Sequence, residues 1–465
     1  MGSSFLNNFL SFWPVLPLLG IVIFFHELGH FLAAKWRGVT VLKFSLGMGP
    51  EMVGFSHGGT RYCLSWIPLG GFVQMAGDSL SEDGSMPAGG PEQFLTHPWY
   101  GRVIIAIAGP AANLVVAWFV VLVMFVTGMK QVDYVNMFGS LRPTSAPYVA
   151  GVREGDLFKS LDGKPLSRWH ELLQAADALG DKQPAVLELE RDGQPLSVTI
   201  PAGQVRSWFS ALNPPPIPAT VGSVAPGMPA YRAGVLEGDR VVAVDGKPVR
   251  WFEDIVENLK GKADQPVRFR LERKGKPYEL DLTPMRADPE HPDSKNGYVG
   301  IGAERGLTWI DKRTFGEAVP AAFTGTGALV SMVYKNLWMT LSRPVYYRQA
   351  VGGPILIGQM ARDSAKQGLD SFLYLLAMIN LAIMSFNLLP VPLLDGGHIT
   401  LALIEAVRRR AMSGRSYINF QKVGLVLVGS LFIFIFSQDI LRPIERLRAV
   451  DKAPRETTTV DPTHR

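Results

Sequence analysis

Four long apolar stretches dominate the chain and alternate with mixed regions. They cover approximately residues 10–34, 103–129, 372–394 and 423–436. A helix that crosses a bilayer needs about 20 mainly apolar residues. The fourth stretch is shorter, but it is rich in Phe, Ile, Val and Leu, and Phe420 and Ile440 extend it. The pattern therefore predicts a multi-pass α-helical membrane protein with about four transmembrane helices.

Residues 39–77 follow a different pattern, in which polar residues alternate with β-branched and aromatic ones between pairs of glycines. This alternation predicts β-hairpins. Strands that follow directly on a membrane helix can lie at membrane depth only if their backbone is paired or faces a cavity. We expect a membrane-associated re-entrant β-sheet whose edge can pair with an extended substrate. A small cytoplasmic hairpin domain is the alternative.

Two segments of the region after the second apolar stretch repeat each other at a spacing of about 83 residues. One contains AGVREGD and then LDGKP, and the other contains AGVLEGD and then VDGKP. A repeat of this length indicates two copies of one small domain. The pattern resembles bacterial PDZ domains, so we expect two extracytoplasmic PDZ-like α+β domains. Such domains bind extended peptides by strand addition, and here they either capture a peptide terminus or exclude large substrates.

Composition agrees with membrane helices joined by water-soluble modules. The chain has 465 residues, of which 47% are hydrophobic and 19% charged. Its net charge of +5 is not clustered, so we expect no nucleic-acid partner. The single cysteine, Cys63, excludes an intramolecular disulfide framework. Because no Lys or Arg precedes Lys35, the first apolar stretch is interpreted as a retained anchor and not a cleaved signal peptide.

The short loops indicate the orientation, since cytoplasmic loops carry an excess of Lys and Arg. Arg408, Arg409, Arg410, Arg415 and Lys422 place the loop between the third and fourth spans in the cytoplasm. Both termini and the region 130–370 then lie outside, although Arg442, Arg446 and Arg448 oppose this. The predicted divisions are helix 1 (1–38), re-entrant hairpins and a cytoplasmic loop (39–101), helix 2 (102–129), PDZ-like domains (130–215 and 216–286), amphipathic connecting helices (287–369), helix 3 (370–410), helix 4 (411–441) and a tail (442–465).

The first span contains His26-Glu27-Leu28-Gly29-His30. Two histidines four residues apart project from one helix face. They can bind one Zn²⁺, with the intervening Glu27 as a base for its water. Ionisable groups in hydrocarbon are costly unless they serve a site. A soluble zincin helix, or a chance match in a core helix, is the alternative. Lys35 lies about 12 Å along the helix from Glu27, so we expect the site nearer the cytoplasmic side.

A catalytic zinc usually has a third protein ligand. Asp395 is the only acid between Asp370 and Glu405, and Pro390 and Pro392 break the helix just before it. Gly396 and Gly397 permit a sharp turn that aims the carboxylate at the metal. His398 is a rival ligand, with a histidine at a helix start as its ordinary interpretation.

Three asparagines in the spans carry weaker signals. Asn387 either hydrogen-bonds a substrate backbone or an oxyanion or caps the broken helix. Asn380 and Asn113 are interpreted as packing residues.

The combination of HELGH, AGPAAN and NLLPVPLLDGG resembles the site-2 protease family of intramembrane zinc metalloproteases, in the arrangement of bacterial members with tandem PDZ domains. The resemblance covers nearly the whole chain. It implies Zn²⁺ held by His26, His30 and Asp395, with Glu27 as the catalytic base and Asn387 contacting substrate. Asn380 and Asn387 are further apart than the usual asparagine pair of the family, so only Asn387 is carried over.

The same resemblance implies an endopeptidase of the bacterial inner membrane that cleaves single-pass transmembrane substrates. These are an anti-sigma factor already trimmed by another protease, in envelope-stress signalling, and remnant signal peptides. We expect a monomer in contact with membrane lipid. A catalytically inactive PDZ-bearing scaffold with structural zinc is one alternative. A transporter or channel with intramembrane His and Asp groups is another.

Overall fold

The computed structural model describes residues 13–80, 87–225, 228–286, 295–304, 306–342 and 352–452. The chain divides into two compact units. The first contains the residues up to Met129 together with Lys312–Ile440. The second contains Lys130–Asp311 and the residues after Ile440. The start of the first predicted span, residues 1–12, and the end of the predicted tail, residues 453–465, lie outside the described residues.

Within the described part of the first unit, four helices are long and apolar enough to cross a membrane, which agrees with the predicted multi-pass protein. They are α2 (Val15–Arg37), α3 (Trp99–Thr127), α12 (Leu369–Asn387) and the Gly414–Ser437 part of α14 (Gly414–Lys452).

The ends of two of these helices differ from the prediction. The third predicted span was too long, because α12 ends at Asn387 and a separate helix, α13 (Asp395–Arg408), begins after the prolines. The predicted tail was also wrong at its start, since α14 continues as a helix to Lys452.

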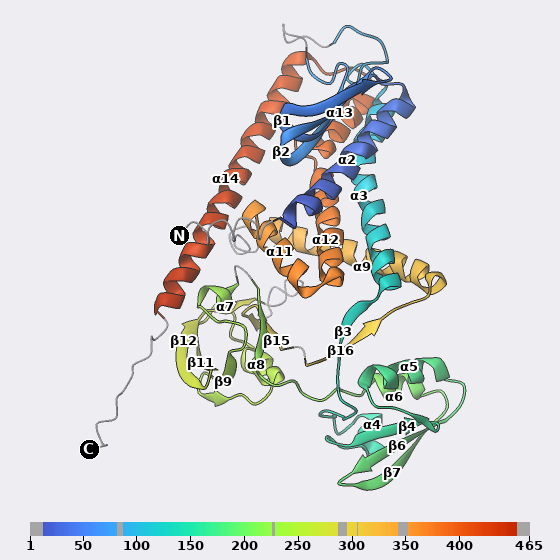
Figure 1. Ribbon diagram of the computed structural model, residues 1–465, viewed down its shortest axis with the longest axis vertical. Coiled ribbons are helices and arrows are strands. Elements are labelled where there is room, and N and C mark those ends of the chain that lie inside the picture. Colours follow the sequence, from blue (N-terminus) through green and yellow to red (C-terminus); the bar gives the residue numbers. More distant parts are fainter. Residues whose placement is uncertain are drawn as a thin grey trace, which may run out of the picture. The chain divides into compact units, whose positions relative to one another are not determined.

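Helices α2, α3 and α12 lie side by side and form the core of the first unit (Figure 1). On α2 the buried positions Leu18, Val22, His26 and His30 follow each other at a spacing of four residues. This spacing forms one stripe along a helix. The apolar part of the stripe packs against buried side chains of α3 and α12. The two histidines continue the same stripe and therefore face the interior of the bundle.

The predicted hairpins form a sheet of two long strands, β1 (Val41–His57) and β2 (Thr60–Met75). Each strand is irregular, and its two halves pair separately. Segment 41–46 of β1 pairs on one side with 61–64 and on the other with 71–75 of β2. Segment 51–57 pairs with 60–65. The order of segments is therefore 51–57, 60–65, 41–46 and 71–75, so that 71–75 forms one edge of the sheet.

Two further helices of the first unit lie where helical connections were expected. They are α9 (Phe315–Ser342) and α11 (Pro354–Gln367). The N-terminus of α11 receives a buried side chain from α14, because the Asp439 carboxylate accepts hydrogen bonds from the backbone N–H groups of Gly353 and Ile355. Such a carboxylate satisfies donors that a helix start leaves without partners.

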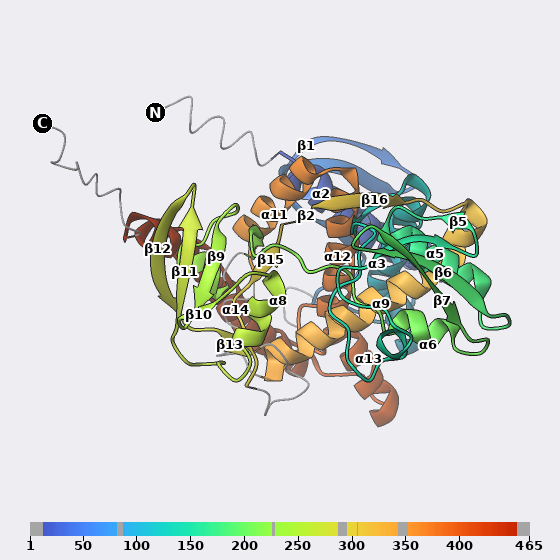
Figure 2. The same ribbon diagram turned by 90° about the horizontal axis from the view of Figure 1, so that it is seen from below.

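The second unit contains two α+β modules built from the repeated sequence. Each has a four-stranded antiparallel sheet, in the orders β5-β4-β6-β7 and β10-β9-β11-β12. The sheet of the second module can be followed in Figure 2. The first module comprises α4 (Ala146–Val149), β4 (Leu157–Leu161), β5 (Lys164–Pro165), α5 (Trp169–Leu179), β6 (Ala185–Arg191), β7 (Gln194–Ile200) and α6 (Val205–Ser210). The second comprises β8 (Val221–Val224), α7 (Pro229–Arg232), β9 (Arg240–Val244), β10 (Lys247–Pro248), α8 (Phe252–Asn258), β11 (Val267–Arg273) and β12 (Lys276–Leu282).

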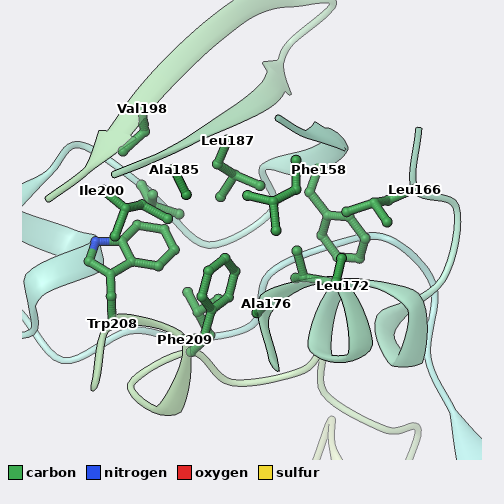
Figure 3. Close-up of a cluster of buried hydrophobic side chains, with 14 of the residues drawn as sticks. Phe158, Leu166, Leu172, Ala176, Ala185, Leu187, Val198, Ile200, Trp208 and Phe209 are labelled. Carbon is green, nitrogen blue, oxygen red and sulfur yellow. The ribbon is translucent and has the colours of Figure 1, made fainter. Parts of the chain in front are cut away.

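Each module has its own hydrophobic core. In the first, side chains from the sheet and from α5 and α6 meet around Phe158, Leu172, Leu187 and Trp208, which are all fully or almost fully buried (Figure 3). Val241, Val267, Phe269 and Leu271 lie in the corresponding core of the second module. Along β11 the buried residues Val267, Phe269 and Leu271 alternate with exposed arginines, as expected for a sheet with one buried face.

The region predicted as connecting helices, 287–369, also contains strands. These are β14 (Gly297–Tyr298) paired with β13 (Met285–Arg286), β15 (Ile301–Ala303) paired with β8, and β16 (Leu307–Asp311) paired with β3 (Met129–Asp133). Val299 is buried in the core of the second module. That module therefore extends past the predicted boundary at 286, because its sheet needs these later residues to cover its core.

Candidate metal centre

His26 and His30 bring their imidazole rings together on the buried face of α2. His26 is 7% exposed and His30 is 8% exposed, and the centroids of their rings are 4.8 Å apart. His26 Nε2 lies 3.3 Å from His30 Nε2. Both Nε2 atoms therefore point to one place in the bundle.

Helix α2 approaches α3 closely at this level because both helices carry glycine. A Cβ atom on Gly29 would lie 2.2 Å from the carbonyl oxygen of Ala108. A Cβ atom on Gly109 would lie 2.2 Å from His30 Nε2. The glycine of the HELGH motif and the glycine of α3 thus leave the room that the histidine needs.

The carboxylate of Asp395 meets both histidines from the other side. Its Oδ2 lies 3.2 Å from His26 Nε2, and its Oδ1 lies 3.3 Å from His30 Nε2. Asp395 is the first residue of α13. Leu393, two residues before Asp395, has a φ of 75°, a conformation that costs a non-glycine residue energy and often marks a functional site.

Gly396 and Gly397 were predicted to make a sharp turn, and this prediction was wrong. They lie inside the first turn of α13. Their role is close packing, since a Cβ on Gly396 would lie 2.1 Å from the carbonyl oxygen of Leu389, and one on Gly397 would lie 2.5 Å from that of Val391. The loop after α12 can therefore fold back against the start of α13.

The second nitrogen of each histidine has a partner on α3. His30 Nδ1 donates to the carbonyl oxygen of Ile105 at 2.8 Å. His26 Nδ1 lies 3.2 Å from the side-chain amide of Asn113, whose Oδ1 is buried without a hydrogen-bond partner. With its amide turned by 180° about χ2, Asn113 accepts the His26 Nδ1–H, and the buried oxygen gains a partner. Both Nε2 atoms then carry a lone pair.

These residues fit a divalent metal ion. Two lone pairs face each other at 3.3 Å, which is unfavourable without a cation between them. Asp395 Oδ2 is buried and makes no hydrogen bond. Ligand atoms of a tetrahedral zinc site lie about 3.4 Å apart when the bonds are about 2.1 Å, close to the distances found here. His26, His30 and Asp395 are the group that could hold a metal within the described part of the chain.

Glu27 lines the same cleft, which has a volume of about 470 Å³. The edge segment 71–75 of the sheet forms another wall, with Phe72 and Val73. A Cβ atom on Gly71 would lie 3.2 Å from Glu27 Cγ, so glycine lets the strand pass beside this side chain. The carboxyl group of Glu27 is thus placed between the metal ligands and the sheet edge.

Of the other residues considered from the sequence, two line the cleft and one bonds within its own helix. Asn387 lines the cleft, and its Nδ2 lies 3.1 Å from His26 Nε2. His398 also lines the cleft, but its ring packs edge-on against Phe94 and it is not part of the three-ligand group. Asn380 donates to the carbonyl oxygen of Leu376 within its own helix, in agreement with a packing role.

The sequence interpretation missed two parts of the site. Asn113 was assigned to packing, because its contact with His26 Nδ1 depends on how α3 packs against α2. The cleft wall also contains Tyr417 and Gln421 of α14, for which the sequence carried no recognisable signal.

Comparison with known proteins identifies the family. The profile described as Peptidase family M50 matches residues 14–431. The chain belongs to this family. It is thus a metalloendopeptidase of the site-2 protease type, as the motifs predicted. The match runs from α2 into α14 and includes both histidines, Glu27 and Asp395.

Curated relatives cover nearly the whole chain. Proteins from Xylella fastidiosa and Treponema pallidum are each 30% identical, over 93% and 91% of this chain and 99% and 97% of their own. A protein from Neisseria meningitidis is 29% identical over 91% of this chain and 97% of its own. Each is named "Putative zinc metalloprotease", in agreement with the predicted Zn²⁺.

Among solved structures, one from Geobacillus thermodenitrificans is 40% identical but covers 17% of this chain with a TM-score of 0.15.

Proposed function

We propose that this protein is a zinc-dependent endopeptidase that hydrolyses peptide bonds within transmembrane segments of single-pass substrates. One observation carries the proposal: His26, Glu27 and His30 lie on α2, which is long and apolar enough to span a membrane, and Asp395 at the start of α13 completes a His-His-Asp ligand set. Placing ionisable groups within a membrane costs free energy, so such groups mark functional sites. Zinc, when bound, lowers the pKa of a water molecule and polarises the scissile carbonyl.

Residues of the chain supply proton transfer, orientation of the histidines and hydrogen bonds to the substrate. Glu27 takes the proton of the attacking water and passes it to the leaving amine. The Ile105 carbonyl and Asn113 hold the two histidines with Nε2 towards the metal. Asn387 donates its amide N–H to the substrate backbone or to the developing oxyanion.

The sheet edge supports a role in substrate binding. A helical substrate hides its scissile bond, so it has to unwind before hydrolysis. Segment 71–75 forms an edge of the β1–β2 sheet and a wall of the cleft. An extended substrate that pairs with this edge would present its backbone to Glu27 and the metal.

We propose further that the two repeated modules are PDZ domains outside the cytoplasm of a bacterial inner membrane, with the metal centre nearer the cytoplasmic side. The Lys and Arg of the short loops support this orientation. In this arrangement the modules exclude substrates with large outer domains or capture their trimmed ends. A pre-trimmed anti-sigma factor and remnant signal peptides are the proposed substrates, and the enzyme acts as a monomer.

A cleavage assay in detergent tests the reaction. Wild type, Glu27→Gln and Asp395→Ala are compared on a single-pass substrate, with and without a chelator. We expect cleavage by wild type alone, abolished by the chelator and restored by Zn²⁺, and normal zinc content in Glu27→Gln. Normal turnover by Glu27→Gln would refute the mechanism. Chelator-insensitive activity would refute the metal requirement, and no cleavage with bound zinc would favour a scaffold.

A second assay tests the modules. Residues 134–306 are replaced by a flexible linker, and both chains receive a trimmed substrate and one with a folded outer domain. If the modules exclude substrates by size, wild type should cleave the trimmed substrate only, whereas the shortened chain should cleave both. Equal preference in the two chains would contradict this exclusion.

A further inference from the structure

A buried ion pair joins α3 to α13 away from the metal ligands. The guanidinium group of Arg102 donates a hydrogen bond to the carboxylate of Glu405. The side chains are only 9% and 10% exposed, although the two residues stand 303 positions apart in the sequence. Opposite charges so far from solvent are held only where their geometry is well defined.

Glu405 has a second contact that extends the connection. Its other oxygen, Oε1, accepts the backbone N–H of Met412 at 2.9 Å. Met412 lies between the end of α13 and the start of α14. One carboxylate therefore ties α3, α13 and the chain leading to α14 together.

The ion pair lies beside the metal cleft. Arg102 and Glu405 border a small cavity of about 10 Å³ that also contacts Leu95 and Leu401. Three other residues of its wall also line the metal cleft: Phe94, His398 and Tyr417. The ion pair is thus separated from the metal cleft by a single layer of side chains.

Helix α13 links the ion pair to a metal ligand. Asp395 is its first residue, ten positions before Glu405, a distance of about 15 Å along a helix. The other two ligands are already fixed to α3, through Ile105 and Asn113. Because α13 also packs along α3, a tie at its far end fixes its axial position against the same helix that orients the histidines.

We propose that Arg102 and Glu405 are positioning residues that hold α13 so that Asp395 reaches the metal. This proposal rests on the metal site of the proposed function. It assigns the pair to ligand geometry, because a buried ion pair contributes little net stability compared with apolar side chains of similar volume. A loose α13 would leave His26 and His30 in place but carry Asp395 away from them.

The test measures zinc affinity of the purified full-length chain by competition with a chelator, independently of activity. We expect Glu405→Gln to weaken zinc binding by about tenfold or more, as loss of a group that orients a ligand does. Glu51→Gln is the matched control, since Glu51 forms its ion pairs with Lys43 and Arg61 on the sheet. It should bind zinc like wild type.

Two further variants separate positioning from general destabilisation. Val121→Ala removes buried volume from the other end of α3 and should lower the melting temperature without changing zinc affinity. The exchanged pair, R102E with E405R, should recover part of the affinity that either single change loses. Wild-type affinity in Glu405→Gln, or an equal loss in Val121→Ala, would overturn the proposal. Wild-type affinity in Asp395→Ala would overturn the metal site itself, and the pair's role with it.

Discussion

Asn113 and His26 meet across two membrane helices, with the Asn113 amide 3.2 Å from His26 Nδ1. Asn113 is fully buried, and its Oδ1 gains a partner only when the amide is turned so that it accepts the His26 Nδ1–H. Burying an amide with so few hydrogen bonds costs free energy, so we infer that its position beside the proposed metal ligand His26 has a function. It selects the His26 tautomer that leaves Nε2 for the metal.

Replacement of Asn113 by Ala should therefore weaken zinc binding by about 10- to 100-fold. The physical reason is that His26 loses the acceptor that holds its ring and its proton. Zinc affinity measured by chelator competition checks this. Asn380→Ala is the control, because Asn380 is equally buried but bonds the carbonyl of Leu376 in its own helix. Equal losses in the two variants would contradict the role of Asn113.

Replacement of Asn387 by Ala should lower kcat by about 10²- to 10³-fold, the effect of removing one oxyanion donor, while zinc content stays normal. The amide of Asn387 lies in the cleft beside His26. Single-turnover cleavage and metal analysis provide the two readouts. Ser385→Ala serves for comparison, since Ser385 bonds the carbonyl of Leu381 in the same helix. Unchanged kcat in Asn387→Ala would leave it as a structural residue.

Gly29→Ala should destabilise the first unit by about 1–3 kcal/mol, the usual effect of overpacking. A Cβ at this position meets the Ala108 carbonyl oxygen at 2.2 Å, and backbone cannot move aside as a flexible side chain can. Gly20→Ala on the same helix finds no atom within 4 Å. It should raise stability by about 0.5–1 kcal/mol, since alanine favours the helix. Thermal unfolding in detergent measures the stability of both variants. Equal changes in melting temperature would contradict the prediction.

Tyr278→Phe should make the second module less sensitive to alkaline pH. Burial, followed by a 2.6 Å hydrogen bond to Asp239, raises the pKa of the Tyr278 hydroxyl. Between the ordinary tyrosine pKa of about 10 and the raised value, the folded state keeps a proton that the unfolded state has lost. Stability therefore falls as pH rises above about 10, and the Phe variant lacks this contribution.

The comparison uses thermal unfolding of the full chain at pH 8 and at about pH 10.5, followed by near-ultraviolet circular dichroism. The first module provides an internal reference. Its Arg191–Asp156 pair matches Arg273–Asp239, but Leu196 stands at the position of Tyr278. If wild type and Tyr278→Phe lose the same amount of stability between pH 8 and about pH 10.5, the Tyr278 hydroxyl is not the cause of the loss.

Much of this protein could be predicted from local patterns. Length and hydropathy determine the membrane helices, because each helix satisfies its own backbone wherever it lies. The spacing of His26 and His30 places both on one face, since a helix returns to that face every four residues. Asp395 stood out as an isolated acid after two helix-breaking prolines. The repeat determined two similar modules, as each copy carries its own turns and core.

Other features were decided only by tertiary structure. The end of α12, the role of Asn113, the packing role of Gly396 and the Arg102–Glu405 pair all depend on which backbone comes within a few ångströms of another. The return of residues 295–303 to the second module is of the same kind. Sequence periodicity describes which face of an element is buried, but not what it meets. The HELGH motif thus placed two of the proposed ligands on one helix face by itself, whereas the placement of Asp395 and the orientation of His26 required the packed helices.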